Sequence, residues 1–426
     1  MTELREASCD VRKKIGQYKN FNPVVYRKIL AAFGKIRGIP VIHINATAQG
    51  GGVAEMLQGQ IALERDIGLK SRWLVIDGAP KEFFEATKKI HNLLQGKSGE
   101  LTEMEKEAYL ETNHELRASL QKIIGKYKRG VVMIHDPQPL PLVHCIPDNF
   151  AKILRVHIDL STPNAATLDF LRPHIEKYDK VVLSSKTYKS SFLWLPKSKK
   201  EIIMPAIDPL SLKNQPMDLR VAQDILEKFE INCTQPLISQ VSRFDPWKDP
   251  MGVIKAYYLA KNEIPELQLI LAGFAFAKDD PESAEIFKTV QKHAKGDPDI
   301  FLFSDPRLLR DFSNDTFISA VFTASDVVVQ KSIREGFGLT MTEAMWKGKP
   351  LVAGKTAGAL LQIKHGKNGL LVSSPEEAAR AIVRLFKDKK LAARLGKSAR
   401  ESVKKNFLFP RYLLEHLELY RSFIIP

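Results

Sequence analysis

Two successive series of alternating strand-like and helix-like segments dominate this sequence. From residue 41 onward, short β-rich runs alternate with longer segments of helical period, which is the pattern of βαβ units with parallel sheets. The expected strands are Val41–Asn45, Arg72–Ile76, Val131–His135, Ile153–Ile158 and Val181–Ser184 in the first series, and Leu237–Val241, Leu267–Ala272, Ile300–Phe303, Val327–Gln330 and Pro350–Ala353 in the second. The sequence therefore predicts an α/β protein with two Rossmann-like, doubly wound domains facing a cleft.

A proline-rich stretch separates the two series. Between Met204 and Met217, prolines such as Pro205 and Pro209 disfavour helix and break sheet ladders, so we place a hinge near them. The predicted domains are residues 1–205 and 206–409, and residues 410–426 follow as a separate segment. The first 40 residues are expected to form a polar helical extension. Ligands of open α/β sheets bind beyond the carboxyl ends of the strands, so we expect the reaction in the cleft.

Composition excludes several classes of protein. The net charge of +15 comes mainly from two basic stretches, residues 1–40 and 376–405, which read as solvated helical faces without interleaved aromatics, so we expect no nucleic-acid partner. The chain has neither an apolar run long enough for a membrane span nor the features of a signal peptide at its start. Its three cysteines are widely spaced and read as free thiols. We expect a cytoplasmic protein without a membrane partner, with homodimerisation left open.

A glycine triplet follows the first expected strand. Gly50, Gly51 and Gly52 open the helix expected over Val53–Ile67, so backbone N–H groups and a positive helix end can approach an anion there. The triplet fits neither the dinucleotide fingerprint nor the P-loop. A plain tight turn is the alternative reading.

Two cations follow the first strand of the second series. Arg243 and Lys248 lie in the segment after Leu237–Val241, at a strand end in the expected cleft. Two fixed cations at such a place suit a diphosphate. The alternative is that both side chains lie on a solvated loop.

Two carboxylates follow the strand Val327–Gln330. Glu335 precedes a Gly-Phe-Gly loop, and Glu343 follows eight residues later, inside a helix that starts near Leu339. Helix propensity alone explains Glu343 but not the glycine-rich loop. A loop that presents backbone N–H groups between carboxylates can bind phosphate and sugar hydroxyls together.

The E-x7-E spacing of Glu335 and Glu343, with Ser242-Arg243-Phe244 and Lys248, resembles the family-4 retaining glycosyltransferases of glycosyltransferase-B fold. The resemblance covers nearly the whole chain from about residue 41. Within that family the chain is similar to the glycosyltransferring trehalose synthases. The segments that carry this narrower resemblance are Gly50-Gly-Gly-Val-Ala-Glu55, His91-Asn-Leu-Leu-Gln-Gly96, His135-Asp-Pro-Gln-Pro139, Arg155-Val-His-Ile-Asp159 and Asp245-Pro-Trp-Lys-Asp-Pro250.

The resemblance assigns roles to individual residues. It implies that Arg243 and Lys248 hold the donor diphosphate, that Glu335 contacts donor-sugar hydroxyls and that Glu343 binds the nucleotide ribose. The remaining implied contacts are backbone of Gly336, Phe337, Gly338 and Leu339 on the donor, Gly52 near the donor phosphate, and Gly51, Asp136 and His157 on the acceptor side. A histidine hydrogen-bonded at a strand end is the plainer reading of His157.

The resemblance also implies where the end of the chain lies, and the sequence departs from the family pattern in two places. The segment 410–426, with a helix over Tyr412–Tyr420, resembles the part with which such chains return to the first domain. Ala357-Gly358 stands where the family has a Gly-Gly pair, and Ala46-Thr-Ala-Gln49 differs from the usual run before the glycines. These departures bear on donor and acceptor preference rather than on the fold.

The implied function is a retaining glycosyltransferase that moves glucose from UDP- or ADP-glucose to free glucose to form trehalose. Its partners are a nucleotide-sugar donor and a small sugar acceptor. We expect no cofactor and no metal, since Arg243, Lys248 and the loop N–H groups can stabilise the leaving phosphate; Asp297-Pro-Asp299 is read as a polar turn. The alternatives are a retaining trehalose phosphorylase using glucose 1-phosphate, a family-4 transferase with a lipid, protein or glycerate acceptor, and a non-catalytic sugar-nucleotide-binding protein.

Overall fold

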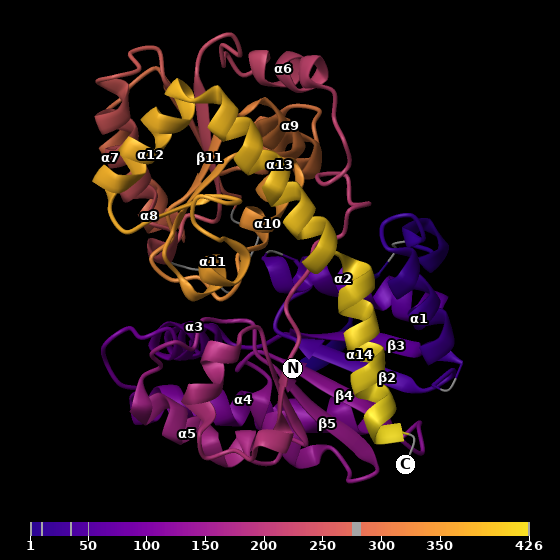
Figure 1. Ribbon diagram of the computed structural model, residues 1–426. Helices are drawn as coiled ribbons and strands as arrows, with labels where there is room; N and C mark the ends of the chain where they lie inside the picture. Colours follow the sequence, from indigo (N-terminus) through magenta and orange to yellow (C-terminus); the bar gives the residue numbers. More distant parts are fainter. Residues whose placement is uncertain (1, 10–11, 35, 50, 275–282, 425–426) are drawn as a thin grey trace. The chain divides into compact units, whose positions relative to one another are not determined.

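The computed structural model describes residues 2–424 apart from 10–11, 35, 50 and 275–282. The described residues divide into two compact units. One contains the chain up to Pro205 and again from Phe409 onward, and the other contains the chain from Ala206 to Leu408 (Figure 1). Each unit is an α/β structure around its own sheet, which confirms the fold class that the alternating pattern predicts.

A seven-stranded sheet forms the centre of the first unit. Its strands are β1 (Glu3–Glu6), β2 (Pro40–Asn45), β3 (Lys70–Asp77), β4 (Gly130–His135), β5 (Phe150–Arg155), β6 (Lys180–Leu183) and β7 (Lys200–Ile202). Their spatial order is β1-β3-β2-β4-β5-β6-β7, and only β1 runs antiparallel to its neighbour among these described strands. All residues of β2 and β4 are buried, as expected of central strands covered on both faces.

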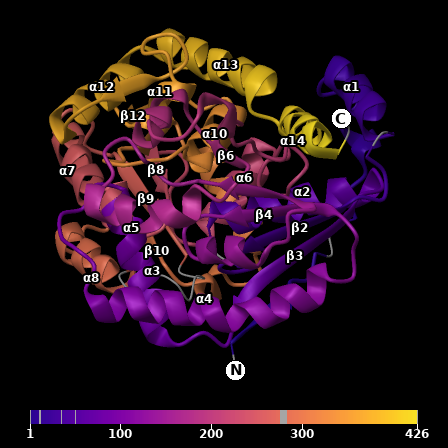
Figure 2. The same cartoon turned by 90° about the horizontal axis from the view of Figure 1, so that it is seen from below.

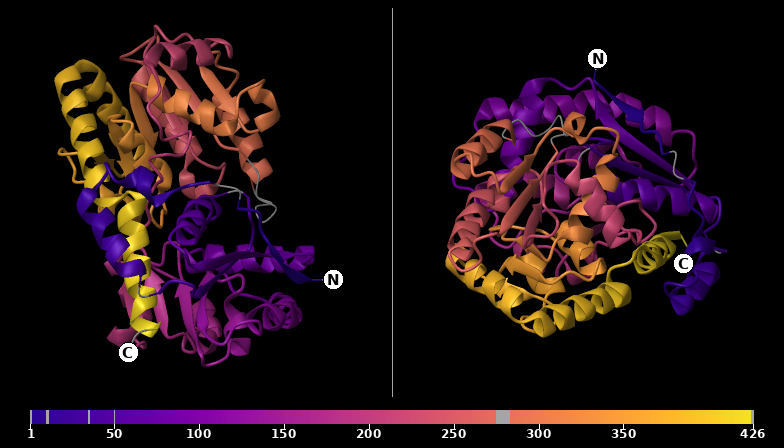
Figure 3. Two further views of the ribbon diagram at one scale, coloured as in Figure 1. Left: turned by 90° about the vertical axis from the view of Figure 1, so that its right-hand side faces the viewer. Right: turned by 90° about the horizontal axis from the view of Figure 1, so that it is seen from above.

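Helices cover both faces of this sheet. They are α1 (Pro23–Phe33), α2 (Gly52–Asp66), α3 (Lys81–Leu94), α4 (Glu103–Ile124), α5 (Ala165–Ile175) and α14 (Phe409–Ile424). The connection from β2 to β3 and the connection from β3 to β4 run in opposite directions along the sheet, so right-handed crossovers place α2 on one face and α3 and α4 on the other. The C-terminal helix α14 packs against α1 and α2 (Figures 2 and 3). Gly59 permits this approach, because a Cβ there would lie 2.0 Å from the ring of Phe409.

A six-stranded parallel sheet forms the centre of the second unit. Its strands are β8 (Leu237–Val241), β9 (Gln268–Ala272), β10 (Ile300–Phe303), β11 (Val327–Gln330), β12 (Leu351–Gly354) and β13 (Leu370–Val372). The spatial order is β10-β9-β8-β11-β12-β13. Its helices are α6 (Leu219–Glu227), α7 (Pro250–Lys261), α8 (Ser283–Ala294), α9 (Asn314–Ala324), α10 (Leu339–Trp346), α11 (Ala357–Gln362), α12 (Pro375–Lys387) and α13 (Lys389–Asn406).

The second unit is also layered. Helices α7, α8 and α12 lie on one side of β11 in Figure 1, and α9, α10 and α13 lie on the other. Aliphatic side chains of the strands and of α7 and α12, including Ile254 and Ile382, form one buried core on the α7 face. The direction of winding reverses between β8 and β11, as it does between β2 and β4 in the first unit. The carboxyl ends at such reversals are where doubly wound sheets place their ligands.

The first 40 residues do not form the polar helical extension that was predicted. Residues Glu3–Glu6 form an edge strand that pairs antiparallel with β3, and the helix of this region starts only at Pro23. The pairing with β3 is a tertiary interaction. It could not be predicted from a run of four residues in which only one side chain, that of Leu4, is buried. Similarly, β5 covers Phe150–Arg155 rather than Ile153–Ile158, because the chain leaves the sheet after Arg155.

Candidate functional site

Two loops meet at the carboxyl edge of the second sheet. The first loop (residues 242–249) follows β8 and the second loop (residues 331–338) follows β11, and these two strands are parallel neighbours. The N–H of Ile333 donates to the carbonyl of Trp247 at 2.8 Å, which joins the loops directly. The predicted cations and the predicted carboxylate Glu335 therefore lie at one edge of one sheet.

An ion pair links the two loops at their exposed side. The ammonium of Lys248 lies 2.5 Å from Oε2 of Glu335, with 22% and 12% of the two side chains exposed. Both groups are partly accessible, so a ligand could take a hydrogen bond from the ammonium and donate one to the carboxylate. A phosphate oxygen and a sugar hydroxyl have these complementary properties.

Hydrogen bonds within the first loop hold Lys248 in place. Its carbonyl accepts from the side-chain amide of Gln240 at 2.8 Å. The next residue, Asp249, has a φ of +50° and caps α7 by accepting from the N–H of Gly252 at 3.0 Å. The other oxygen of Asp249 pairs with the ammonium of Lys331 from the second loop. The backbone that carries Lys248 is therefore fixed on both sides.

Arg243 lies at the start of the first loop and is partly exposed, while the neighbouring Phe244 is buried. The backbone before it is closely packed, because a Cβ on Gly273 would lie 1.9 Å from the carbonyl oxygen of Ser242. Arg243 and Lys248 thus emerge from one rigid loop. Four residues, 242–245, separate the end of β8 from the 3-10 turn Pro246–Lys248, whose last residue pairs with Glu335.

The Gly-Phe-Gly loop turns sharply into α10. Gly338 has a φ of +84°, and a Cβ there would lie 2.4 Å from Cε of Met341, so only glycine fits. Phe337 is buried, and its carbonyl accepts from the side-chain amide of Gln362 at 2.6 Å. The N-cap residue of α10 is Gly338, which has no side chain to cap the helix that starts at Leu339. The loop therefore directs an uncapped helix N-terminus, a group that favours anions, beyond the sheet edge.

Glu343 lies in the second turn of α10 and is almost completely buried. Its Oε1 is 2.6 Å from the ammonium of Lys213, and 13% of that lysine side chain is exposed. Lys213 comes from the proline-rich segment that precedes the first strand of this unit. This partner could not be predicted from the sequence, because a lone lysine in a loop has no characteristic spacing.

The first unit carries the remaining predicted residues. Helix α2 begins at Gly52, after Gly51 with a φ of +85° and without a side-chain cap; Gly50 lies outside the described residues. Positive φ at Gly51 explains the glycine there. The loop follows β2, at the reversal of winding of the first sheet.

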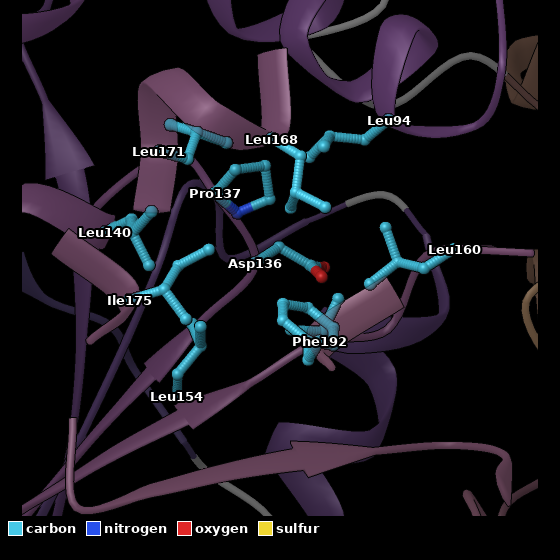
Figure 4. Close-up of a pocket in the computed structure, with 11 residues that line it drawn as sticks. Leu94, Asp136, Pro137, Leu140, Leu154, Leu160, Leu168, Leu171, Ile175 and Phe192 are labelled. Atoms are coloured by element: carbon cyan, nitrogen blue, oxygen red, sulfur yellow. The ribbon is translucent and has the colours of Figure 1, made fainter. Parts of the chain in front are cut away.

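Asp136 directly follows β4, with a φ of +62°, and is 9% exposed. Its Oδ1 accepts from the backbone N–H of His157 at 2.7 Å. Figure 4 shows the carboxylate directed into an apolar cavity beside Leu160 and Phe192. Burial there raises the pKa of Asp136 to about 7. In this structure the carboxyl therefore holds the backbone of His157.

His157 ends a buried chain of three histidines and a carboxylate. Its Nε2 is 3.0 Å from Nδ1 of His135, whose Nε2 is 3.1 Å from Nδ1 of His43. The Nε2 of His43 is 3.0 Å from Oε2 of Glu64. Sequence reasoning did not single out His43 or Glu64, although both lie in segments, β2 and α2, that flank the glycine triplet.

Comparisons with known proteins show the family to which the chain belongs. The model of the family described as "Trehalose synthase, N-terminal domain" matches residues 43–190, and that of "Glycosyl transferases group 1" matches residues 221–402. A trehalose synthase of Rubrobacter xylanophilus is 41% identical over 404 residues, covering 94% of each chain. A trehalose synthase of Pyrococcus horikoshii is 39% identical over 424 residues, covering 99% of each chain.

The chain belongs to the trehalose synthase family of glycosyltransferases. The resemblance deduced from the E-x7-E motif and its companion segments is thereby confirmed. As a member of this family the protein is a hexosyltransferase. Trehalose phosphorylases are more distant: that of Pleurotus pulmonarius is 28% identical over 407 residues, covering 86% of this chain and 54% of the fungal protein.

Solved structures share the fold of this trehalose synthase family member. An α,α-trehalose-phosphate synthase (UDP-forming) from Burkholderia xenovorans superposes with a TM-score of 0.72 at 13% identity, covering 91% of this chain and all of the other. A sucrose-phosphate synthase from Thermosynechococcus elongatus gives a TM-score of 0.69 at 20% identity, covering 90% and 98%. These similarities establish the glycosyltransferase-B fold.

Among the described residues, no group of three or more histidine, cysteine or acidic side chains is arranged to hold a metal ion. The carboxylates of Asp297 and Asp299 both contact the ammonium of Lys261, at 3.2 and 2.7 Å. Within the described part of the chain, no helix combines the length and apolarity needed to cross a membrane. None of the three cysteines, which all lie among the described residues, forms a disulfide.

Proposed function

We propose that this enzyme transfers glucose from a nucleotide diphosphate glucose, UDP- or ADP-glucose, to free glucose and so forms trehalose with retention at the anomeric carbon. The observation that carries the proposal is the meeting of Lys248 and Glu335 at 2.5 Å beside the uncapped start of α10. Trehalose synthases at about 40% identity over nearly the whole chain support the choice of product.

The proposed chemistry uses charges of the chain itself. Arg243, Lys248 and the N-terminus of α10 would stabilise the negative charge that develops on the leaving diphosphate. A cationic pair with a helix N-terminus can perform this task without a metal ion, so we propose metal-independent transfer. The acceptor hydroxyl would attack on the face from which the diphosphate departs. Its oxygen bonds to the anomeric carbon as the bond to phosphate breaks, and its proton passes to the departing phosphate oxygen.

The other residues would hold the two substrates. Glu335 would accept hydrogen bonds from donor-sugar hydroxyls and stabilise positive charge at the sugar, and Glu343 would bind the ribose. Gly52 would approach the donor phosphate, and Gly51, with Asp136 and His157, would serve the acceptor side. We further propose that the enzyme acts in the cytoplasm on small molecules.

The test is to incubate the purified protein with UDP-glucose or ADP-glucose, with and without free glucose, and with and without a chelator, and to identify disaccharides by NMR. An α,α-linked product formed in the presence of the chelator is expected. Product formed only from glucose 1-phosphate and glucose would instead establish a phosphorylase, the activity of the relatives at 28% identity. Transfer to another acceptor, or donor binding without transfer or hydrolysis, would also overturn the proposal.

A further inference from the structure

A continuous hydrogen-bonded chain crosses the interior of the first unit from Glu64 to His157. Each step joins side chains of neighbouring elements: Glu64 in α2, His43 in β2, His135 at the end of β4 and His157 just beyond β5. In the sheet register His43 lies opposite Met133, and His135 lies opposite Arg155. Each histidine is thus two residues further along the next strand, which keeps all three on one face of the sheet.

Glu64 is held as a carboxylate at the start of this chain. Its Oε2 accepts from the hydroxyl of Ser71 at 2.7 Å, and its Oε1 accepts from Gln60 at 2.9 Å and from Tyr420 at 3.0 Å. Burial works to raise the pKa of Glu64, but the interaction with His43 and the hydrogen bonds together hold it below its usual value. A carboxylate can only accept, so Nε2 of His43 carries a proton.

The surroundings disfavour a second proton on the histidines. The guanidinium of Arg155 is fully buried in the same unit without a hydrogen-bond partner among the described residues. Burial first, and the positive charge of Arg155 in addition, depress the pKa of both His135 and His157 well below the usual value. If His43 donated from both ring nitrogens, the hydrogen bonds would run in the opposite direction and would end on a buried N–H at Nδ1 of His157 with no acceptor among the described residues. A buried N–H without an acceptor is less favourable than an unfilled lone pair, so we assign one N–H to each imidazole.

Neutral histidines leave a single proton order along the chain. With its proton on Nε2, His43 accepts at Nδ1, so His135 must donate from Nε2 and accept at Nδ1. His157 in turn donates from Nε2 to His135. Its own Nδ1 then carries a lone pair, and this atom is buried without a hydrogen-bond partner among the described residues.

We infer that Glu64 and His43 are positioning residues, which act through His135 to fix His157 in the Nε2–H tautomer and offer its Nδ1 lone pair to a hydroxyl of the bound hexose. The identity of the hydroxyl donor rests on the proposed function, whereas the proton order does not. Nδ1 of His157 is an acceptor without a partner among the described residues, beyond the end of β5, the strand next to the reversal of winding between β2 and β4. A ligand hydroxyl is expected to bind at such a place.

The experiment reads the tautomers directly in the whole protein. The chain is labelled with ¹⁵N at histidine, and proton–nitrogen correlation spectra are assigned by single His→Gln variants. His43, His135 and His157 are each expected to carry the proton on Nε2. Addition of UDP-glucose with glucose is expected to shift the Nδ1 resonance of His157. A proton on Nδ1 of His157, or a doubly protonated His43, would overturn the inference whether or not the protein forms trehalose.

A variant pair connects the tautomer to activity. Glu64→Gln keeps the shape but lets an amide donate to His43, so we expect a mixture of tautomers at His157 and about tenfold or greater loss of kcat/KM for sugar transfer. Tyr420→Phe removes a donor to the same carboxyl group and keeps its charge, so its tautomers and kcat/KM should stay within about twofold of the parent. An unchanged His157 tautomer in Glu64→Gln would overturn the inference. If that variant does not fold, the test is the His157 tautomer in the spectra of the parent protein and of His43→Gln, in which an amide replaces the ring.

Discussion

The ammonium of Lys248 and the carboxylate of Glu335 lie 2.5 Å apart although 87 residues separate them in the chain. Parallel pairing of β8 with β11 brings them together, because the loops that follow both strands emerge at the same sheet edge. Each group partly neutralises the other in the absence of ligand. In the proposed reaction a bound nucleotide sugar would supply a phosphate for the lysine and hydroxyls for the carboxylate. Lys248 would then recognise the phosphate, and Glu335 the sugar.

Lys248→Gln tests the role of the cation. We expect turnover to fall by about 10²-fold or more, because the positive charge that would stabilise the leaving phosphate is lost. The free energy of unfolding should fall by about 1–3 kcal/mol, because the change removes a charged hydrogen bond to Glu335, whose side chain is only 12% exposed. The matched control is Lys255→Gln, which removes a lysine paired with Glu376 on the neighbouring helix. Turnover equal to that of the parent enzyme would place the diphosphate elsewhere.

Glu335→Gln and Arg243→Ala should fail in different ways. Glu335→Gln retains the shape of the side chain, so we expect turnover to fall far more than donor affinity. Arg243→Ala would remove the proposed phosphate contact, which would be made both before and during the reaction, so both affinity and turnover should fall. Donor affinity measured by calorimetry and turnover measured by product release separate the two effects. Full activity in either variant would show that the donor site has been misplaced.

Gly358→Ala tests the packing behind the Gly-Phe-Gly loop. A Cβ at this position would lie 2.6 Å from the carbonyl oxygen of Phe337, and the N–H of Gly358 donates to the carbonyl of Glu335. Both loop residues must therefore shift, and we expect weaker donor binding with a loss of about 1–3 kcal/mol in unfolding free energy. Gly34→Ala, where a Cβ meets nothing within 4 Å, is the control. Equal donor affinities in the two variants would contradict the predicted contact.

The sequence predicted the parts of this structure that depend on local pattern. Strands β8, β10 and β11 have the predicted bounds, because buried parallel strands are rich in apolar residues. The E-x7-E spacing located Glu335 and Glu343, since a loop and one helix fix their separation. The edge strand β1 and the three-residue strands β7 and β13 were missed, because pairing with a neighbour decides such short segments.

Partners that are distant in the chain could not be predicted in the same way. Nothing in the spacing of Lys213 indicates that it lies against Glu343, and nothing in β2 or α2 indicates that His43 faces Glu64. These pairs depend on how helices pack on the sheet. The one available signal was a polar residue within an apolar strand, such as His43. It predicts that the side chain has a hydrogen-bond partner but not which residue the partner is.

Lys213→Met tests the buried pair with Glu343. Removing the ammonium leaves a carboxylate that is 1% exposed without this counter-charge, so we expect the free energy of unfolding to fall by about 3–5 kcal/mol. Denaturant unfolding of the variant measures the loss. Adding Glu343→Gln to Lys213→Met should recover part of it, because the uncompensated charge is then gone. Additive losses in the double variant would contradict a direct coupling of the two residues.

Asp136→Asn tests the burial of the carboxyl that holds His157. Burial raises the pKa of Asp136 from 3.8 to about 7 in the folded protein, against hydrogen bonds from the N–H groups of His157 and Ile158 and the charge of Arg155. Between these pH values the folded state keeps a proton that the unfolded state has lost. This contribution to stability is therefore complete below pH 4 and is lost as the pH rises through about 7, at up to about 1.4 kcal/mol per pH unit.

Asparagine does not titrate, so the variant should lack this part of the pH dependence, and its stability relative to the parent should rise between pH 5 and pH 8. Hydrogen exchange of the β4 and β5 amides at the two pH values measures the stability of the first unit alone. Asp77→Asn, which replaces a half-exposed aspartate at the end of β3, is the control and should keep the parental pH dependence. Equal pH dependence in the parent and Asp136→Asn would show that Asp136 is ionised in the folded protein, in which case its charge rather than its neutral form holds the backbone of His157.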